Sequence, residues 1–262
     1  MEDDPWGGYE DEVDEVTIPT DDDGMGRGEA VGSKFKKRED KEFKVPEGMS
    51  EVSKAVRFLS ESKVPMQIRC GVGMVLRCVE ESVGDQDELV LAALETLLLT
   101  RAKHSPSLQV LAGEALAGLS RMDRVSAGAQ KHLINMCKNL LASQDESVVE
   151  VWRRVLALCM SSSCLSADRL RDDFRLFVLW LCESSRLWHQ RRAGGLLVAP
   201  VCERLSVEEA VGVPKGFESR PKADRVGLIG RAIALCQDTD HRVRLEMAAA
   251  LPKIASSLAG KG

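Results

Sequence analysis

The stretch DTDHRVRLEMAAALPKIASSL, residues 238–258, decides how the chain folds. Its apolar side chains recur every three or four residues, which is the spacing of one face of an α-helix. They are Val243, Met247, Leu251, Ile254 and Leu258. The polar residues Asp238 to His241 come directly before them, and short polar side chains of this kind cap helix N termini. The stretch therefore predicts an amphipathic helix that starts after a turn.

The same arrangement recurs upstream with a period of about forty-one residues. One register is marked by Ile68, Leu108, Val149, Gln190 and Val243, at spacings of 40, 41, 41 and 53 residues. The last spacing holds an insertion of about twelve residues near 208–221. Partner helices are predicted after Ser50 and over residues 87–100, 126–143, 166–183 and 222–236. A single pair of helices cannot bury its apolar face, so the pattern predicts five pairs that pack against their neighbours.

Residues 238–258 also resemble the second helix of a HEAT repeat, a member of the ARM-type repeat class. The resemblance lies in Asp238, Asp240, Val243, Arg244, Ala249, Leu251, Pro252, Ile254 and Ala255. Ile68-Arg69 repeats the Val-Arg feature, whereas Leu108-Gln109 and Val149-Glu150 depart from it. The resemblance implies an all-α fold, a right-handed α-solenoid of about five HEAT-like antiparallel helix pairs over residues 49–262. The ending Leu251-Pro252-x-Ile254-Ala255 is similar to repeats of scaffold and regulatory subunits of type-2A-family protein phosphatases.

Residues 1–48 differ in composition from the rest. Residues 1–30 carry twelve acidic side chains and one basic one, and residues 31–48 carry six basic and four acidic ones. Because such a segment repels itself and has few apolar groups, we expect a disordered acidic arm. With a net charge of −5 for the whole chain, the remaining residues carry +4.

Several function classes lack their sequence signals. The four histidines are isolated, there is no Cys-x-x-Cys pair, and no phosphate-binding loop or nucleophile elbow is present. We therefore expect no enzyme, no cofactor and no metal site. The sequence has no run of about eighteen apolar residues, so we expect no membrane-spanning helix. A body of +4 without a basic stripe does not favour nucleic acid as the partner.

The start of the chain and its cysteines bear on location. The chain begins with Met1-Glu2-Asp3-Asp4, unlike a secretory or mitochondrial leader, and its eight cysteines suit reduced, buried thiols. These features predict a cytoplasmic protein. The cluster Lys36-Lys37-Arg38 adds the nucleus as a further location.

Two surfaces are candidates for binding another protein. The first is the set of turns that join the two helices of each pair. The resemblance to phosphatase scaffolds implies that such turns hold the catalytic subunit. The set comprises Lys63, His104, Asp145, Arg186, Trp188, His189, Asp240 and His241. The second is a row of arginines on the second helices, which line the concave surface in HEAT proteins: Arg153, Arg154, Arg191 and Arg192.

Each candidate has a structural alternative. Arginines could pair internally with aspartates, as Asp240 with Arg244, and Trp188 could be a staple that packs its own turn. The predicted function is a non-catalytic scaffold or regulatory subunit, most specifically of a type-2A-family serine/threonine phosphatase. The alternative is a transport or cytoskeletal adaptor that binds acidic peptides in its groove.

Overall fold

Helices account for all regular secondary structure in the part of the chain that the computed structural model describes, residues 45–119, 125–161, 174–214 and 225–260. This confirms the predicted all-α fold. Residues 1–44 lie outside the described ranges, and with them most of the predicted acidic arm and its Lys36-Lys37-Arg38 cluster. Parts of the predicted helices at 166–183 and 222–236 also lie outside them.

The helices alternate between two sets along the chain. The first set is α1 (Glu51–Ser60), α3 (Gln86–Thr96), α5 (Ala127–Leu140), α8 (Arg175–Leu181) and α11 (Leu228–Leu235). The second set is α2 (Pro65–Glu80), α4 (Pro106–Ala117), α6 (Glu146–Ser161), α9 (Trp188–Cys202) and α12 (His241–Ala259). A π-helical turn, η1 (Leu97–Arg101), continues α3, and a short helix, α10 (Val207–Val211), occupies the start of the predicted insertion.

The helix starts follow the local signals in the sequence. The hydroxyl of Ser50 accepts a hydrogen bond from the amide of Ser53 and caps α1, as predicted. Pro65 and Pro106 each occupy the first turn of their helix, where the missing amide hydrogen costs nothing. The carboxylate of Asp240 accepts from the amide of Arg242 at 2.9 Å and caps α12.

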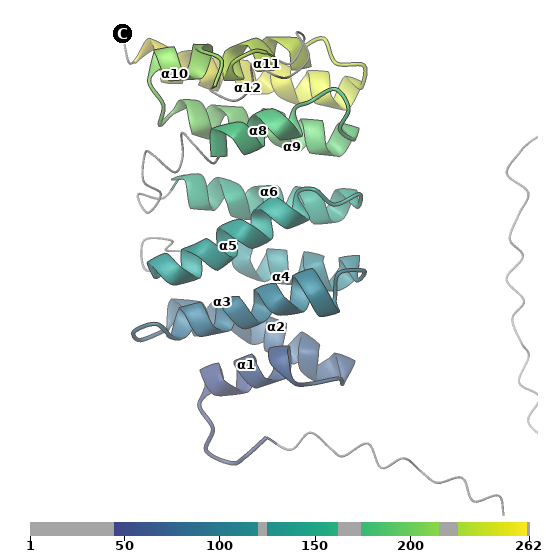
Figure 1. Ribbon diagram of the computed structural model, residues 1–262, viewed down its shortest axis with the longest axis vertical. Helices are drawn as coiled ribbons and strands as arrows, with labels where there is room; N and C mark the ends of the chain where they lie inside the picture. Colours follow the sequence, from purple (N-terminus) through teal and green to yellow (C-terminus); the bar gives the residue numbers. More distant parts are fainter. Residues whose placement is uncertain (1–44, 120–124, 162–173, 215–224, 261–262) are drawn as a thin grey trace, which may run out of the picture. The chain divides into compact units, whose positions relative to one another are not determined.

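Contacts between helices are those of neighbours (Figure 1). Within pairs, α1 contacts α2, α5 contacts α6, α8 contacts α9 and α11 contacts α12. Between pairs, α1 contacts α3, α3 contacts α5 and α8 contacts α11. In the second set, α2 contacts α4, α4 contacts α6, α6 contacts α9 and α9 contacts α12.

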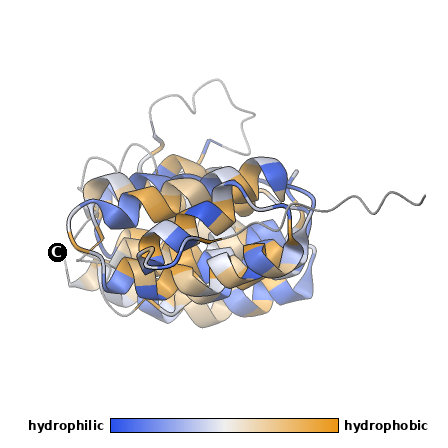
Figure 2. Cartoon of the chain, turned by 90° about the horizontal axis from the view of Figure 1, so that it is seen from below, coloured by the Kyte–Doolittle hydropathy of each residue, from blue (hydrophilic) through white to orange (hydrophobic). Residues whose placement is uncertain are grey.

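The core lies between the two sets of helices. Figure 2 looks along the series, and hydrophobic positions gather in the middle of that view. The largest buried side chains include Trp152 and Phe174, and the indole of Trp152 donates a hydrogen bond to the carbonyl of Gln109 at 3.0 Å. This bond joins α6 to α4 and satisfies the one polar atom of a fully buried tryptophan.

Candidate protein-binding surface

The turns that join α1 to α2, η1 to α4, α5 to α6, α8 to α9 and α11 to α12 lie along one edge of the series (Figure 1). All eight predicted turn residues lie in these connections or in the first turn of the helix that follows. Lys63, His104 and His241 are exposed, Asp145, Arg186, Trp188 and Asp240 are half-buried, and His189 is buried. The structure thus brings residues from five separate parts of the chain to a common border, which we call the turn edge.

Side chains tie neighbouring turns together by hydrogen bonds to backbone carbonyls. The guanidinium of Arg101, at the end of η1, donates to the carbonyls of Leu59 and Ser60, which end α1, and of Ser62 in the turn between α1 and α2. The amide of Gln190, in α9, donates to the carbonyls of Ala142 and Ser143 at 3.0 and 2.9 Å. These contacts satisfy carbonyls at the end of α1 and in two of the turns, so they fix the first turn against the second and the third against the fourth.

The sequence alone does not reveal Arg101 and Gln190 as residues that order the turn edge. Their targets are backbone carbonyls about forty positions away, and any residue supplies a carbonyl. The only available signal was that each is a long polar side chain placed beside a predicted turn.

Trp188 forms an aromatic and cationic cluster with the last turn. The guanidinium carbon of Arg242 lies 3.3 Å from the centroid of the Trp188 ring. Arg242 also pairs with Asp240 at 2.8 Å, and the ring of His189 meets Trp188 edge-on. Trp188 is half-buried and packs partly on the core. It therefore stabilises its own turn, and part of its side chain remains accessible to a partner. Stacked arginine and tryptophan form a preorganised contact surface.

Arg191 is a structural residue. Its Nε and Nη2 donate to the two carboxylate oxygens of Asp238 at 2.7 and 2.6 Å. The side chains are 11% and 8% exposed, so this bidentate pair from α9 to the last turn is almost withdrawn from solvent. Hydrogen bonding to Asp238 raises the pKa of Arg191 against the opposing effect of burial.

The pairing of Asp240 with Arg244, considered above as a structural alternative, is not formed. Asp240 pairs with Arg242, whereas the guanidinium of Arg244 donates to the carbonyls of Asp238 and Thr239. The reason is geometric, because the N-cap position of Asp240 directs its carboxylate at the first turn of α12. The link between successive pairs is made by Arg191 and Asp238 in its place.

The remaining predicted arginines face glutamates. Arg153 pairs with Glu150 at 2.6 Å, and Arg154 of α6 approaches Glu114 of α4 at 3.4 Å. Arg192 of α9 pairs with Glu246 of α12 at 2.6 Å and lies 3.9 Å from Glu150 of α6. Arg153, Arg154 and Arg192 therefore each have a glutamate as counter-charge, so these three arginines offer an acidic peptide less positive charge than unpaired arginines would.

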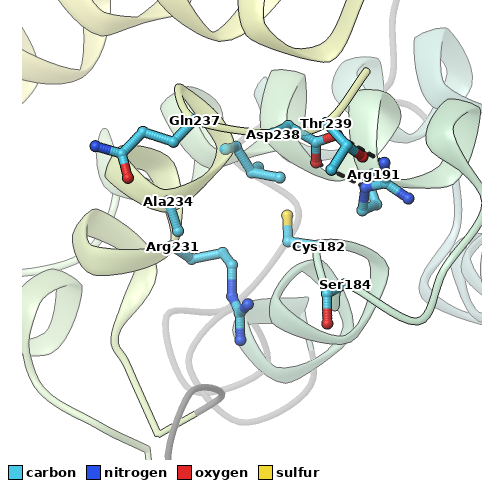
Figure 3. Close-up of a pocket in the computed structure, with 9 residues that line it drawn as sticks. Cys182, Ser184, Arg191, Arg231, Ala234, Gln237, Asp238 and Thr239 are labelled. Atoms are coloured by element: carbon cyan, nitrogen blue, oxygen red, sulfur yellow. Dashed lines mark hydrogen bonds and ion pairs between the residues drawn. The ribbon is translucent and has the colours of Figure 1, made fainter.

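A pocket of about 260 Å³ opens beside the Arg191–Asp238 pair (Figure 3). Its lining includes Cys182, Ser184, Arg231 and Thr239. Burial raises the pKa of the Cys182 thiol to about 12, so this sulfur stays protonated near neutral pH and is a poor nucleophile.

Among the described residues, no group of three or more His, Cys, Asp or Glu side chains is arranged to hold a metal ion. None of the described helices combines the length and apolarity needed to cross a membrane.

No family model, curated protein or solved structure matches the chain.

Proposed function

We propose that residues 49–262 form a right-handed α-solenoid of HEAT-like helix pairs that acts as a non-catalytic protein-binding scaffold. The support is the series of neighbour contacts from α1 and α2 to α11 and α12. Proteins built in this way present long surfaces made of equivalent positions in successive repeats. Such a surface suits recognition of an extended partner rather than chemistry on a small molecule.

The observation that carries this proposal is the turn edge with its Trp188–Arg242 cluster. Trp and Arg are the side chains most enriched where binding energy concentrates, and here the two are already stacked at 3.3 Å. The carbonyl contacts of Arg101 and Gln190 hold the turns before a partner arrives. Preorganisation of this kind lowers the entropy cost of binding.

The partner that we propose is the catalytic subunit of a type-2A-family serine/threonine phosphatase. The support is the resemblance of residues 238–258 to repeats of its scaffold and regulatory subunits, together with the use of intra-pair turns that this resemblance implies. The proposed location is the cytoplasm, with the nucleus as a further site. The adaptor alternative needs free arginines on the second helices, and the ion pairs of Arg153, Arg154 and Arg192 weaken it.

Biolayer interferometry with the immobilised full chain and a purified type-2A-family catalytic subunit tests this proposal. Trp188→Ala removes the centre of the cluster, and we expect an affinity loss of about tenfold or more. Arg154→Glu is the matched control on the second helices, since its side chain is 47% exposed and its pair is loose. It is expected to change the affinity less than about twofold.

Circular dichroism melting verifies that both variants fold. A large effect of Arg154→Glu with none of Trp188→Ala supports the adaptor alternative. Absence of binding by the unmodified chain contradicts the choice of partner.

A further inference from the structure

Helix α12 exposes an apolar stripe on the side opposite its buried face. The buried face consists of Val243, Met247, Ala250 and Ile254. The exposed stripe consists of Leu245, Ala248, Pro252 and Ala255, and Leu245 is 71% exposed. At 3.6 residues per turn, these four positions fall in one line along the helix. No helix in the described part of the chain packs over that line.

The equivalent stripe of α9 is buried beneath the next helix pair. Counted from the first helical residues, Trp188 and His241, the positions of Ala248, Pro252 and Ala255 correspond to Gly195, Ala199 and Cys202. All three α9 residues are buried. A Cβ added to Gly195 would lie 2.7 Å from the sulfur of Met247 and 3.3 Å from a methyl carbon of Leu235. Helix α9 thus receives its neighbour on the face that α12 leaves open.

Helix α4 packs closely against the following helix in the same way. Gly113 is the eighth residue of α4, as Gly195 is of α9. A Cβ on Gly113 would lie 2.4 Å from a methyl carbon of Val151 and 3.0 Å from the indole nitrogen of Trp152. A small residue at the eighth position therefore admits a large side chain from the following helix. Helix α12 has Ala248 at this position, and Ala248 is exposed.

Positive charge flanks the exposed stripe. The helical repeat places Arg244 on one side of it and Lys253 on the other. The guanidinium of Arg244 donates only to two backbone carbonyls, and no carboxylate in the described ranges pairs with Arg244 or Lys253. Glu246 pairs with Arg192 of α9 at 2.6 Å. The surface is therefore an apolar line between two cations.

We propose that this outer face of α12 is a docking site for an amphipathic helix of a partner protein. The partner helix places a large apolar side chain over Ala248, as Met247 lies over Gly195, and directs acidic residues toward Arg244 and Lys253. A second copy of this chain is a poorer occupant, because two such faces would oppose cations to cations. The site meets the turn edge at Arg244, which donates to the carbonyls of Asp238 and Thr239, but it requires neither Trp188 nor a phosphatase.

Fluorescence anisotropy with two synthetic helical peptides tests the proposal on the full chain. Both peptides carry leucines along one face, and they differ only in having glutamates or lysines on the flanks. We expect the glutamate peptide to bind at least about tenfold more tightly than the lysine peptide. Ala248→Glu should reduce the affinity of the glutamate peptide by about tenfold or more. Leu89→Glu, at an exposed apolar site of α3, is the control and should leave binding unchanged.

Three results would overturn the proposal. The two peptides bind with equal affinity, neither peptide binds, or the folded Ala248→Glu variant binds the glutamate peptide as well as the unmodified chain does. Self-association measured by light scattering and abolished by Ala248→Glu would assign the face to a second copy and would equally overturn it. Trp188→Ala is expected to bind the glutamate peptide normally, which separates this site from the turn edge. Melting temperatures verify the fold of each variant.

Discussion

The buried pair of Arg191 and Asp238 gives the sharpest prediction about stability. Arg191→Ala leaves the Asp238 carboxylate, which is 8% exposed, without its counter-charge. Removal of one partner of a buried pair costs about 3–5 kcal/mol, and we expect the lower end because a pocket beside the pair admits water. For a chain of this size, a loss of about 3 kcal/mol lowers Tm by about 6–12 °C.

A double-mutant cycle measured by thermal melting tests this reasoning. Asp238→Ala is expected to cost a similar amount, and the double variant should cost about 2 kcal/mol less than the sum. Arg154→Ala is the matched control, since its pair with Glu114 is 3.4 Å long and about half exposed. It should cost less than about 1 kcal/mol. If Arg191→Ala lowers Tm no more than Arg154→Ala, or if the cycle is additive, the pair does not act as described.

The same pair predicts a specific pH dependence. Burial alone would raise the pKa of Asp238, but hydrogen bonds from Arg191 and from the amide of Asp240 hold it below its usual 3.8. The folded state then binds fewer protons than the unfolded state in acid. The stabilisation is fully present above about pH 4 and is lost as the pH falls further. Tm recorded from neutral pH to about pH 2 should therefore fall more steeply for the unmodified chain than for Asp238→Asn, and parallel curves would argue against the assignment.

Other contacts give shorter predictions. Arg101→Met removes three hydrogen bonds to carbonyls and should destabilise the pair α1 and α2 by about 2 kcal/mol. Hydrogen exchange in α1 and α2 should become faster, and unchanged exchange would contradict the proposed stabilising role of Arg101. Gly113→Ala crowds a neighbouring valine at 2.4 Å and should cost about 1–3 kcal/mol, whereas Gly73→Ala meets nothing within 4 Å and should stabilise by up to about 1 kcal/mol; equal Tm shifts would refute this. A thiol reagent should label exposed Cys70 in the native protein and spare Cys182 until unfolding, as mass spectrometry would show.

Local signals predicted where four of the helices begin, whereas the helix predicted over 222–236 begins only at Leu228. Ser50, Pro65, Pro106 and Asp240 each act within one helical turn of their own position, so the chain's own chemistry determines where α1, α2, α4 and α12 begin. The apolar periodicity identified Val243, Met247 and Ile254 as buried, which they are. Leu251, in the same periodic row, is 37% exposed.

Contacts between helices could not be predicted in the same way. Asp238 and Asp240 are both carboxylates near Arg244, and only the approach of α9 shows that Asp238 pairs with Arg191. The compensation of Arg192 by Glu246, 54 positions away, likewise depends on how two helices meet. The sequence therefore predicted which residues reach the turn edge and the second helices, but not which of their charges are already paired.

Hydrogen exchange on the full chain, with and without a purified type-2A-family catalytic subunit, tests the central functional claim most directly. The proposal predicts that binding protects amides in the turns at 61–64, 102–105, 142–145, 184–187 and 237–240, with the strongest effect around Trp188. Protection confined to the exposed surfaces of α4, α6 and α9, or no protection in the presence of saturating subunit, would contradict it.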